Sequence, residues 1–442
     1  MKWVSSLHVR PVFLLFYFCR IVTKHDFKKS IIFMIFKNKL FILKRRLVYM
    51  RMLRTFHPIG QGGFYSERFI FQGEDNINII YDCGSATGVK NVKQEIAATF
   101  KKGEVIHALF ISHFHADHIN GIEYLLKYYD VKKIFFPLIT DEHKSLLKIK
   151  LLIEKNSNEF LFSFIDNPKE TVRKLLASKK NKQDSPILIA VKWDEKNKDN
   201  DNIIGNNREF YDEIISSGND VASTISTKLY EEWEYVPYNF ERVNRLKELK
   251  KHPPFDSTSF EDLCSSLQAT DKKERKTAMK TMKDAYETVS GDLNSNSMTL
   301  YSGMRNNEGE LSVFQGARKK DYCLLCYVMD CCPPCYRMDN VGCLYTGDYD
   351  ASKVNSFKGL KNKYNKYWDS IKFIQVPHHG AKGNFNSGFL GIDKYFVISV
   401  GLQNTYNHPS IQVISDILLF GGELLIVTED SRSIVQNLIE IY

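Results

Sequence analysis

The chain has 442 residues, of which 43% are hydrophobic and 13% aromatic, and these proportions exclude an intrinsically disordered chain. Its formal net charge is +9, but eleven of the 61 basic residues and one of the 52 acidic residues fall within residues 1–49. The rest of the chain is therefore close to neutral, and its charge does not indicate a nucleic-acid-binding surface. The nine cysteines are an odd number and follow no ordinary signal peptide, which argues against a disulfide framework and predicts a cytoplasmic protein.

Residues 1–49 form a basic and apolar N-terminal extension, in which short apolar runs alternate with basic pairs. None of these runs approaches the ~18 apolar residues that a membrane-spanning helix needs. Two interpretations stay open. Either the extension lies on an anionic membrane surface, or translation begins at Met50 or Met52 and residues 1–49 are not native. Contact with a membrane is expected only in the first case.

From residue 50 onward the sequence has the pattern of a packed α/β protein, and residues 50–139 are predicted to be the first half of its fold. Strands are expected at residues 69–71, 77–81, 105–112 and 133–137, and helices at residues 92–101 and 119–129. The third of these strands is a continuous apolar run that leads directly into a cluster of histidines.

Residues 140–290 are rich in Lys, Asp, Asn and Glu and have helical periods at 142–155 and 266–288. We expect a large helical insertion here, mobile at the polar stretch 194–207, which could bind a partner protein or act as a lid. Residues 291–442 are then predicted to be the second half of the α/β fold. Its strands are expected at residues 298–301, 322–329, 342–346, 371–376, 395–400 and 423–428.

The strongest chemical signal is a cluster of His113, His115, Asp117 and His118 immediately after the buried strand. Imidazole nitrogens and carboxylate oxygens are the donors that bind Zn²⁺. A loop that leaves a strand can turn the first two residues toward one ion and the last two toward its neighbour. A His-rich surface loop is the alternative, but three histidines and one aspartate within six residues favour a metal site.

This pattern resembles the His-x-His-x-Asp-His signature of the metallo-β-lactamase superfamily. Asp82, at the end of an earlier strand, resembles the aspartate that supports the metal loop in this family. Asp348 resembles the aspartate that bridges two metals. His378 and His379 resemble the motif that gives one histidine to the second metal, and we favour His379 as that ligand.

The closer resemblance is to one branch, the hydrolase domain of bacterial DNA-uptake competence proteins and their soluble relatives. The matching stretches lie within residues 56–138 and 294–440 and leave the insertion outside. They include Asn296 and Ser297, which the resemblance assigns to the surroundings of the metals. The resemblance implies an α/β fold of four layers, the αββα sandwich, with its metals at one edge between the two sheets.

Two departures from this family bear on the metals and the chemistry. Many members have another histidine before the Asp348 motif, but residues 293–298 contain none. The resemblance therefore implies one or two Zn²⁺ ions, with Mn²⁺ as an alternative. The branch also has serine after the His-His-Gly motif, whereas Ala381 stands here and is followed by Lys382.

His408 lies in the turn Asn407–Pro409 and has two interpretations. A single histidine in a turn is commonly solvated. The branch resemblance instead puts this turn near the metal edge, where His408 would donate a proton or contact a phosphate.

Six cysteines between residues 323 and 343 form a second cluster. The pairs Cys323–Cys326 and Cys332–Cys335 have spacings that a structural zinc could use. However, the first pair falls in an expected strand, where positions three apart face opposite sides. Core positions and a hairpin tip are therefore favoured over a zinc site.

Together these residues predict a metal-dependent hydrolase that uses metal-activated water. Asp117 or Asp348 would orient the water, and His408 or Lys382 would assist the leaving group. The branch resemblance implies a phosphodiester substrate, a nucleic acid or a nucleotide, and so a phosphodiesterase or nuclease-like enzyme. A bacterial defence-associated hydrolase is a related interpretation. Two alternatives stay open: a small-molecule ester, thioester or lactam hydrolase, and a metal-stabilised binding protein with little turnover.

Overall fold

The structure is a computed structural model, and its described residues are 50–71, 73–139, 141–153, 158–177, 184–193, 210–240, 251–267, 271–288, 297–305, 309–315, 336–337 and 340–441. The chain divides into two units, Met50–Ile441 and a unit made of residues 1–49 and 442, and the second unit lies outside the described residues. The polar stretch 194–207, the strand expected at 322–329 and all of the clustered cysteines except Cys343 also lie outside them. None of the helices among the described residues is long and apolar enough to cross a membrane.

Two large sheets form the centre of the fold. The strands are β1 (Met50–Phe56), β2 (Gly62–Phe71), β3 (Ile77–Ser85), β4 (Val105–Ile106), β5 (Ala108–Phe110), β6 (Asp130–Val131), β7 (Lys133–Pro137), β8 (Ile187–Lys192), β9 (Glu213–Ser216), β10 (Trp233–Tyr238), β11 (Thr299–Met304), β12 (Gly309–Gln315), β13 (Tyr336–Arg337), β14 (Gly342–Tyr345), β15 (Ile371–Gln375), β16 (Tyr395–Ser399), β17 (Glu423–Val427) and β18 (Val435–Ile441).

Ten strands form the first sheet, in the order β13-β12-β18-β1-β2-β3-β5-β7-β8-β9, and six form the second, in the order β10-β11-β14-β15-β16-β17. The first sheet is parallel from β3 to β9, and the second is parallel from β14 to β17. Loops at the carboxyl ends of parallel strands are the usual place for a ligand site in such sheets. The histidine cluster follows β5 and therefore lies at such an end.

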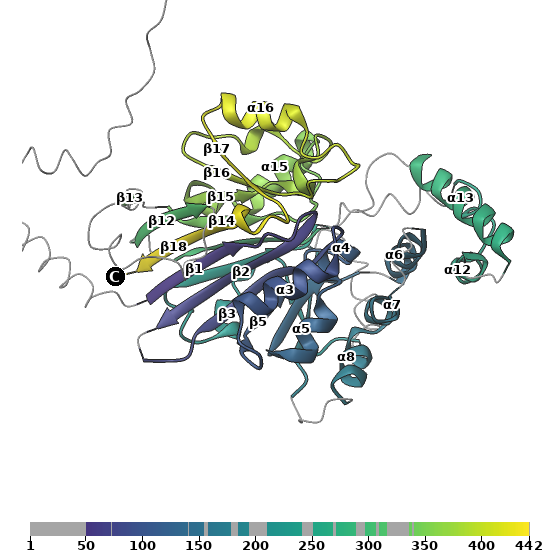
Figure 1. Cartoon of the computed structure of the whole chain (residues 1–442), viewed down its shortest axis with the longest axis horizontal. Helices are drawn as coiled ribbons and strands as arrows, with labels where there is room; N and C mark the ends of the chain where they lie inside the picture. The colour runs from purple at the N-terminus through teal and green to yellow at the C-terminus, as the bar shows by residue number, and fades with distance from the viewer. Residues whose placement is uncertain are drawn as a thin grey trace, which may run out of the picture. The chain divides into compact units, whose positions relative to one another are not determined.

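Helices lie on the outer faces of the sheets (Figure 1). The α-helices are α3 (Val89–Thr99), α4 (Ala116–Ile119), α5 (Ile122–Tyr128), α6 (Asp141–Ile153), α7 (Glu159–Asp166), α8 (Pro168–Ala177), α10 (Ala222–Ile225), α12 (Phe260–Leu267), α13 (Lys272–Thr288), α15 (Val354–Lys363) and α16 (Ile411–Leu419). Helices α3 and α5 lie beside the ten-stranded sheet, and α15 and α16 lie beside the six-stranded one.

The strands alternate their buried side chains between two cores, as a period of two residues requires. In β5, Ala108 and Phe110 face the core between the sheets, whereas Leu109 faces the helices. In β16, Val397 faces the same inner core and Phe396 faces the outer helices. Three separate apolar clusters therefore lie between four layers, and this is the predicted αββα arrangement.

A buried ion pair of the ten-stranded sheet faces the core between the sheets. Arg54 of β1 donates from Nε to Glu67 Oε1 of β2 at 2.6 Å, and neither side chain reaches solvent. Glu67 also accepts hydrogen bonds from the six-stranded sheet, from Ser302 Oγ at 2.6 Å, Tyr345 Oη at 2.9 Å and the hydroxyl of Tyr235. Burial opposes the charge on Arg54, but the neighbouring carboxylate raises its pKa above the ordinary value. The pair therefore joins the two sheets through polar contacts inside an apolar core.

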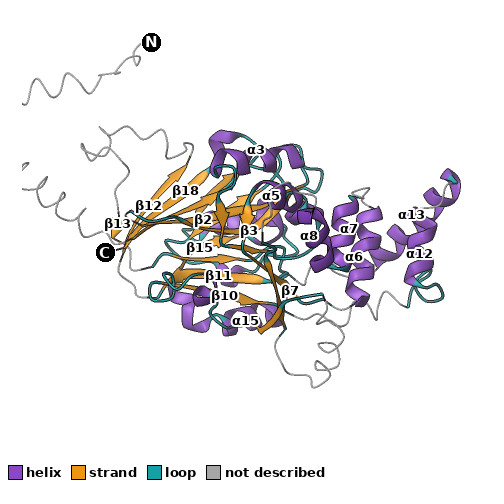
Figure 2. Ribbon diagram, turned by 90° about the horizontal axis from the view of Figure 1, so that it is seen from below, coloured by secondary structure: helices purple, strands orange, loops and turns teal. Residues whose placement is uncertain are grey.

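The segment expected as a helical insertion, residues 140–290, contains strands as well as helices. Helices α6, α7 and α8 stand together beside the sheets, with α12 and α13 on their outer side (Figure 2). However, β8 and β9 extend the ten-stranded sheet, and β10 forms an edge of the six-stranded sheet. The expectation of a purely helical block is wrong for these strands. Ile187–Lys192 is an apolar run of strand length, but the polar segments around it favoured the helical interpretation, and its parallel pairing with β7 shows that it is a strand.

Candidate metal centre

The histidine cluster lies in the loop between β5 and α4, and its side chains turn inward. His113, His115 and His118 are each at most 5% exposed. Asp117 is the most accessible member of the cluster, with 21% of its side chain exposed. Burial of three imidazoles at the end of a strand is costly unless each finds a partner, and most of the partners come from other segments of the chain.

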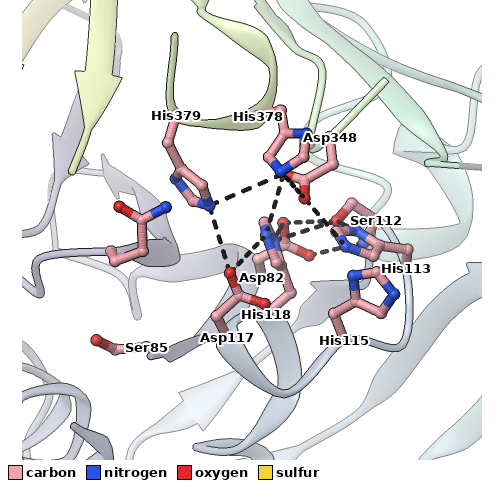
Figure 3. Close-up of polar contacts among 12 residues, drawn as sticks. Asp82, Ser85, Ser112, His113, His115, Asp117, His118, Asp348, His378 and His379 are labelled. Atoms are coloured by element: carbon pink, nitrogen blue, oxygen red, sulfur yellow. Dashed lines mark hydrogen bonds and ion pairs between the residues drawn. The ribbon is translucent and has the colours of Figure 1, made fainter. Parts of the chain in front are cut away.

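Two groups of potential ligands converge at this point (Figure 3). One consists of His113, His115 and Asp348, and the other of Asp117, His118 and His379. Within each group, one donor atom per residue lies within 4.8 Å of the others. The sequence places these residues in three segments up to 266 positions apart, after β5, after β14 and after β15. The fold therefore brings together donor atoms that a pair of metal ions could share.

Asp348 lies between the two groups. Its Oδ2 is 3.6 Å from His113 Nε2, and its Oδ1 is 3.3 Å from His118 Nε2. The backbone N–H of Asp348 donates to Ser297 Oγ at 2.9 Å, which holds the start of this loop in place. A carboxylate with one oxygen toward each group has the geometry of a bridging ligand.

The second nitrogen of the histidines is held by the protein. Asp82 Oδ2 lies 2.7 Å from His118 Nδ1, Ser112 Oγ lies 2.8 Å from His113 Nδ1, and the Ser399 carbonyl lies 2.9 Å from His379 Nδ1. Asp82 also accepts from the backbone N–H and the hydroxyl of Ser112, both at 2.7 Å. Such contacts fix the ring orientation and leave Nε2 to face the site.

The Nε2 atoms of His113 and His118 are buried and make no hydrogen bond among the described residues. A buried polar atom without a hydrogen bond is costly and calls for an explanation. A metal ion bound at these nitrogens would remove the cost. Imidazole nitrogens combined with carboxylate oxygens are the donor set that suits Zn²⁺, and Mn²⁺ accepts the same oxygens. The residues present therefore fit a metal ion.

The electrostatics of the site also favour a cation. Burial, reinforced by His118, lowers the pKa of His113 to about 3, so this ring is neutral and its lone pair is available. For His118, burial acts against protonation, but Asp348, Asp82 and Asp117 outweigh it and raise the pKa well above the ordinary value. The surrounding carboxylates thus stabilise positive charge at this position.

His378 and His379 both adopt the left-handed backbone conformation, with φ of 48° and 55°. Non-glycine residues occupy this region only when their surroundings hold them there, and such strain is common at functional sites. The result is that both rings reach the site. His379 Nε2 lies 3.3 Å from Asp117 Oδ2, whereas His378 Nε2 lies 3.7 Å from Asp348 Oδ2 and its Nδ1 lies 3.1 Å from Asn384 Oδ1. His379 is also the more buried of the two, which supports the preference for it as a ligand.

Gly84 makes room for the metal loop. A Cβ added there would lie 2.6 Å from backbone atoms of Asp117 and His118, closer than real Cβ atoms come. We therefore expect Gly84→Ala to cost about 1–3 kcal/mol of stability through overpacking and to weaken Zn²⁺ binding. Gly359→Ala is the matched control, because a Cβ on this glycine of α15 meets nothing within 4 Å. Thermal unfolding and metal titration of both variants would test this, and equal behaviour would contradict it.

The other predicted site residues are only partly brought together. The His408 ring lies 5.4 Å from that of His378, at the rim of the site. Ser297 Oγ lies 3.3 Å from His113 Nδ1 as well as contacting Asp348. Lys382 is exposed, and no contact between it and the cluster is present among the described residues. Asn296 lies outside the described residues.

Sequence reasoning missed one residue that reaches the cluster. Lys150 of α6 has its Nζ 3.1 Å from His115 Nε2. Burial first, and this ammonium second, lower the pKa of His115 well below its ordinary value. No motif indicated the contact, because Lys150 lies in the segment expected as a helical insertion, where no site residue was predicted.

Residues 69–179 match the model of the metallo-β-lactamase superfamily. The chain is also similar to ribonuclease J of Mycoplasma genitalium and to ribonuclease J of Mycoplasma pneumoniae. Each is 31% identical over 100 residues, which is 20% of this chain and 18% of the relative. The chain thus spans less than a fifth of the length of these relatives. The predicted superfamily is confirmed for residues 69–179 and the α/β fold class for the described residues, and the closer resemblance to DNA-uptake proteins stays a prediction.

Proposed function

We propose that this chain, which carries a metallo-β-lactamase superfamily domain, is a metal-dependent phosphodiesterase that acts on a nucleic acid. One observation carries the proposal. Two groups of potential metal ligands converge, and the buried Nε2 atoms of His113 and His118 within them make no hydrogen bond among the described residues. The similarity to two ribonucleases supports a phosphodiester substrate, and RNA in particular. That similarity covers 20% of this chain.

His113, His115 and Asp348 would hold one ion, and Asp117, His118 and His379 would hold its neighbour. When bound, such ions lower the pKa of water toward ~7, provide a nucleophile near neutral pH and neutralise charge on a phosphate. Zn²⁺ is the metal that the histidine-rich donor set favours, and Mn²⁺ is the alternative.

Asp117 is suited to orient the attacking water. Its side chain is the most exposed of the site carboxylates, at 21% against 2% for Asp348. Although burial acts in the opposite direction, His118 and His379 hold its pKa below the ordinary value, so the carboxylate is ionised at neutral pH and accepts a hydrogen bond. Asp117 can therefore accept a hydrogen bond from water and orient it, while its neighbours keep the carboxylate in position.

His408 is suited to contact the substrate rather than to protonate the leaving group. Burial first, and then His378 and His379, lower the pKa of His408 to about 4. At neutral pH the ring is therefore uncharged and can donate an N–H hydrogen bond to a phosphate oxygen, but it carries no additional proton. Of the two roles near the metals that the sequence left open for His408, the lowered pKa favours the phosphate contact.

A panel of substrates tests the proposed function. The full chain, loaded with Zn²⁺ or Mn²⁺, would be assayed on bis-p-nitrophenyl phosphate, labelled single-stranded RNA and DNA, p-nitrophenyl acetate and a chromogenic lactam. We expect bound metal together with cleavage of the phosphodiesters. Cleavage of only the ester or the lactam would replace the proposal with a small-molecule hydrolase. Bound metal without turnover of any substrate would favour a metal-stabilised binding protein.

A further inference from the structure

Helix α6 (Asp141–Ile153) leaves the first sheet after β7 and passes beside the metal loop. Its Lys150 is half-buried, and its ammonium lies 3.1 Å from Nε2 of the buried His115. The other two lysines of this helix have different surroundings. Lys144 lies over the Phe210 ring, 4.2 Å from its centroid, and Lys148 pairs with Asp166 at 2.7 Å. Lys150 is therefore the lysine that α6 brings to the metal centre.

The contact between Lys150 and His115 cannot persist unchanged when His115 binds an ion. An ammonium donates to a ring nitrogen only when that nitrogen carries no proton, so in this arrangement the imidazole proton is on Nδ1. If Nε2 takes the ion, this nitrogen no longer accepts a hydrogen bond from the ammonium. If Nδ1 takes the ion, the one proton of the neutral ring moves to Nε2, and two donors then face each other. In both cases the ammonium has to leave His115, while its stem remains anchored on α6.

We propose that Lys150 contacts a non-bridging phosphate oxygen of the substrate and gives the site its preference for anionic over neutral substrates. The inference rests on the proposed function and deepens it. A lysine ammonium is a compact charge on a flexible stem and commonly binds phosphate as a point charge. Lys382, the cation that the sequence suggested for such a role, is exposed and makes no contact with the described site residues. The cation that reaches the cluster thus comes from α6, where the sequence predicted no site residue.

The charge balance of the site agrees with this role. Asp82, Asp117 and Asp348 together contribute up to three negative charges beside the bound ions. A phosphodiester brings a further negative charge and loses water when it enters the site, so a cation close to the phosphate stabilises it in addition to the metal ions. A neutral ester has no such requirement, and its hydrolysis should not depend on Lys150.

The test compares Lys150→Met with Lys150→Arg and with Lys148→Met, which removes an equal charge from the same helix. Each full-length variant would be loaded with Zn²⁺, and its binding of a fluorescein-labelled single-stranded RNA would be measured by anisotropy across a range of salt concentrations. Turnover of bis-p-nitrophenyl phosphate and p-nitrophenyl acetate would be measured in parallel.

For K150M we expect about 10- to 100-fold weaker RNA binding and an equal fall in kcat/KM for the phosphodiester, as the loss of a hydrogen bond between charged groups implies. The binding constant should also depend less steeply on salt concentration, by the amount expected for the loss of about one phosphate contact. Metal content and turnover of the acetate ester should stay unchanged, K150R should recover part of the loss, and K148M should behave as the wild type.

Unchanged RNA binding by K150M would overturn the proposal. A parallel loss of metal or of acetate turnover would also overturn it, because Lys150 would then support His115 rather than the substrate. Failure of the proposed function has a different signature. If the wild type binds RNA but cleaves no phosphodiester, and K150M binds it more weakly, the hydrolysis is rejected and the Lys150 contact stands.

Discussion

Asp348→Asn is expected to lower kcat/KM for phosphodiester hydrolysis by about a thousandfold or more. The carboxylate lies 3.6 Å from His113 Nε2 and 3.3 Å from His118 Nε2, so it belongs to both ligand groups. The amide has nearly the same shape but carries no charge, and it cannot bridge two cations in the same way. Metal-ion catalysis supplies several kcal/mol, and each ~1.4 kcal/mol corresponds to a factor of ten in rate. Steady-state kinetics and metal analysis would measure the effect.

The control for this variant is Asp393→Asn. Asp393 is exposed and has a φ of 62°, a conformation that asparagine tolerates well. It should retain both metal and activity. Because Asp348 is buried, unfolding must be followed as well. Zn²⁺ should raise the thermal midpoint of the wild type and of D393N, since a ligand that binds only the folded state stabilises it, whereas D348N should gain much less. A D348N protein with wild-type metal content and activity would contradict the proposed ligand set.

Glu67→Gln is expected to give the largest loss of stability, about 3–5 kcal/mol. Arg54 would keep its charge in the core between the sheets but would lose the carboxylate that compensates it. Chemical denaturation followed by circular dichroism would measure the change. The double variant Arg54→Met, Glu67→Gln should recover much of the loss, because it removes the uncompensated charge while the amide oxygen can still accept from the surrounding hydroxyls.

The matched control for the buried pair is an exposed one. Asp430 and Arg432 lie 2.6 Å apart on the surface, where solvent screens their attraction. Asp430→Asn should therefore leave the denaturation midpoint almost unchanged. If Glu67→Gln were as stable as Asp430→Asn, the ion pair between the sheets would contribute nothing to the fold.

Two strands that lie outside the expected helical insertion were predicted closely from their apolar runs. The strand Lys133–Pro137 has the predicted bounds, and Ile371–Gln375 differs from its prediction by one residue. The apolar run 105–112 is instead divided into β4 and β5, because His107 interrupts the pairing and its backbone N–H donates to the Asn78 carbonyl. Strands that depend on pairing with distant segments were missed, among them β1, which pairs with β18.

The sequence by itself determined which donors the site contains. His113, His115, Asp117 and His118 lie within six residues, so their proximity is a property of the local chain. Their chemistry, and the resemblance to a known signature, pointed to metal-dependent hydrolysis before any geometry was considered.

Only the tertiary structure decided how these donors are grouped and oriented. Asp348 and His379 reach the loop because the parallel strands of two sheets end at the same edge, and no local pattern determines which ends meet. The free nitrogen of each ring depends on where Asp82, Ser112 and Ser399 lie in space. Lys150 reaches the centre because α6 packs beside it. Spacing along a chain determines neighbours within a few residues, whereas contacts between distant segments depend on the packing of the whole fold.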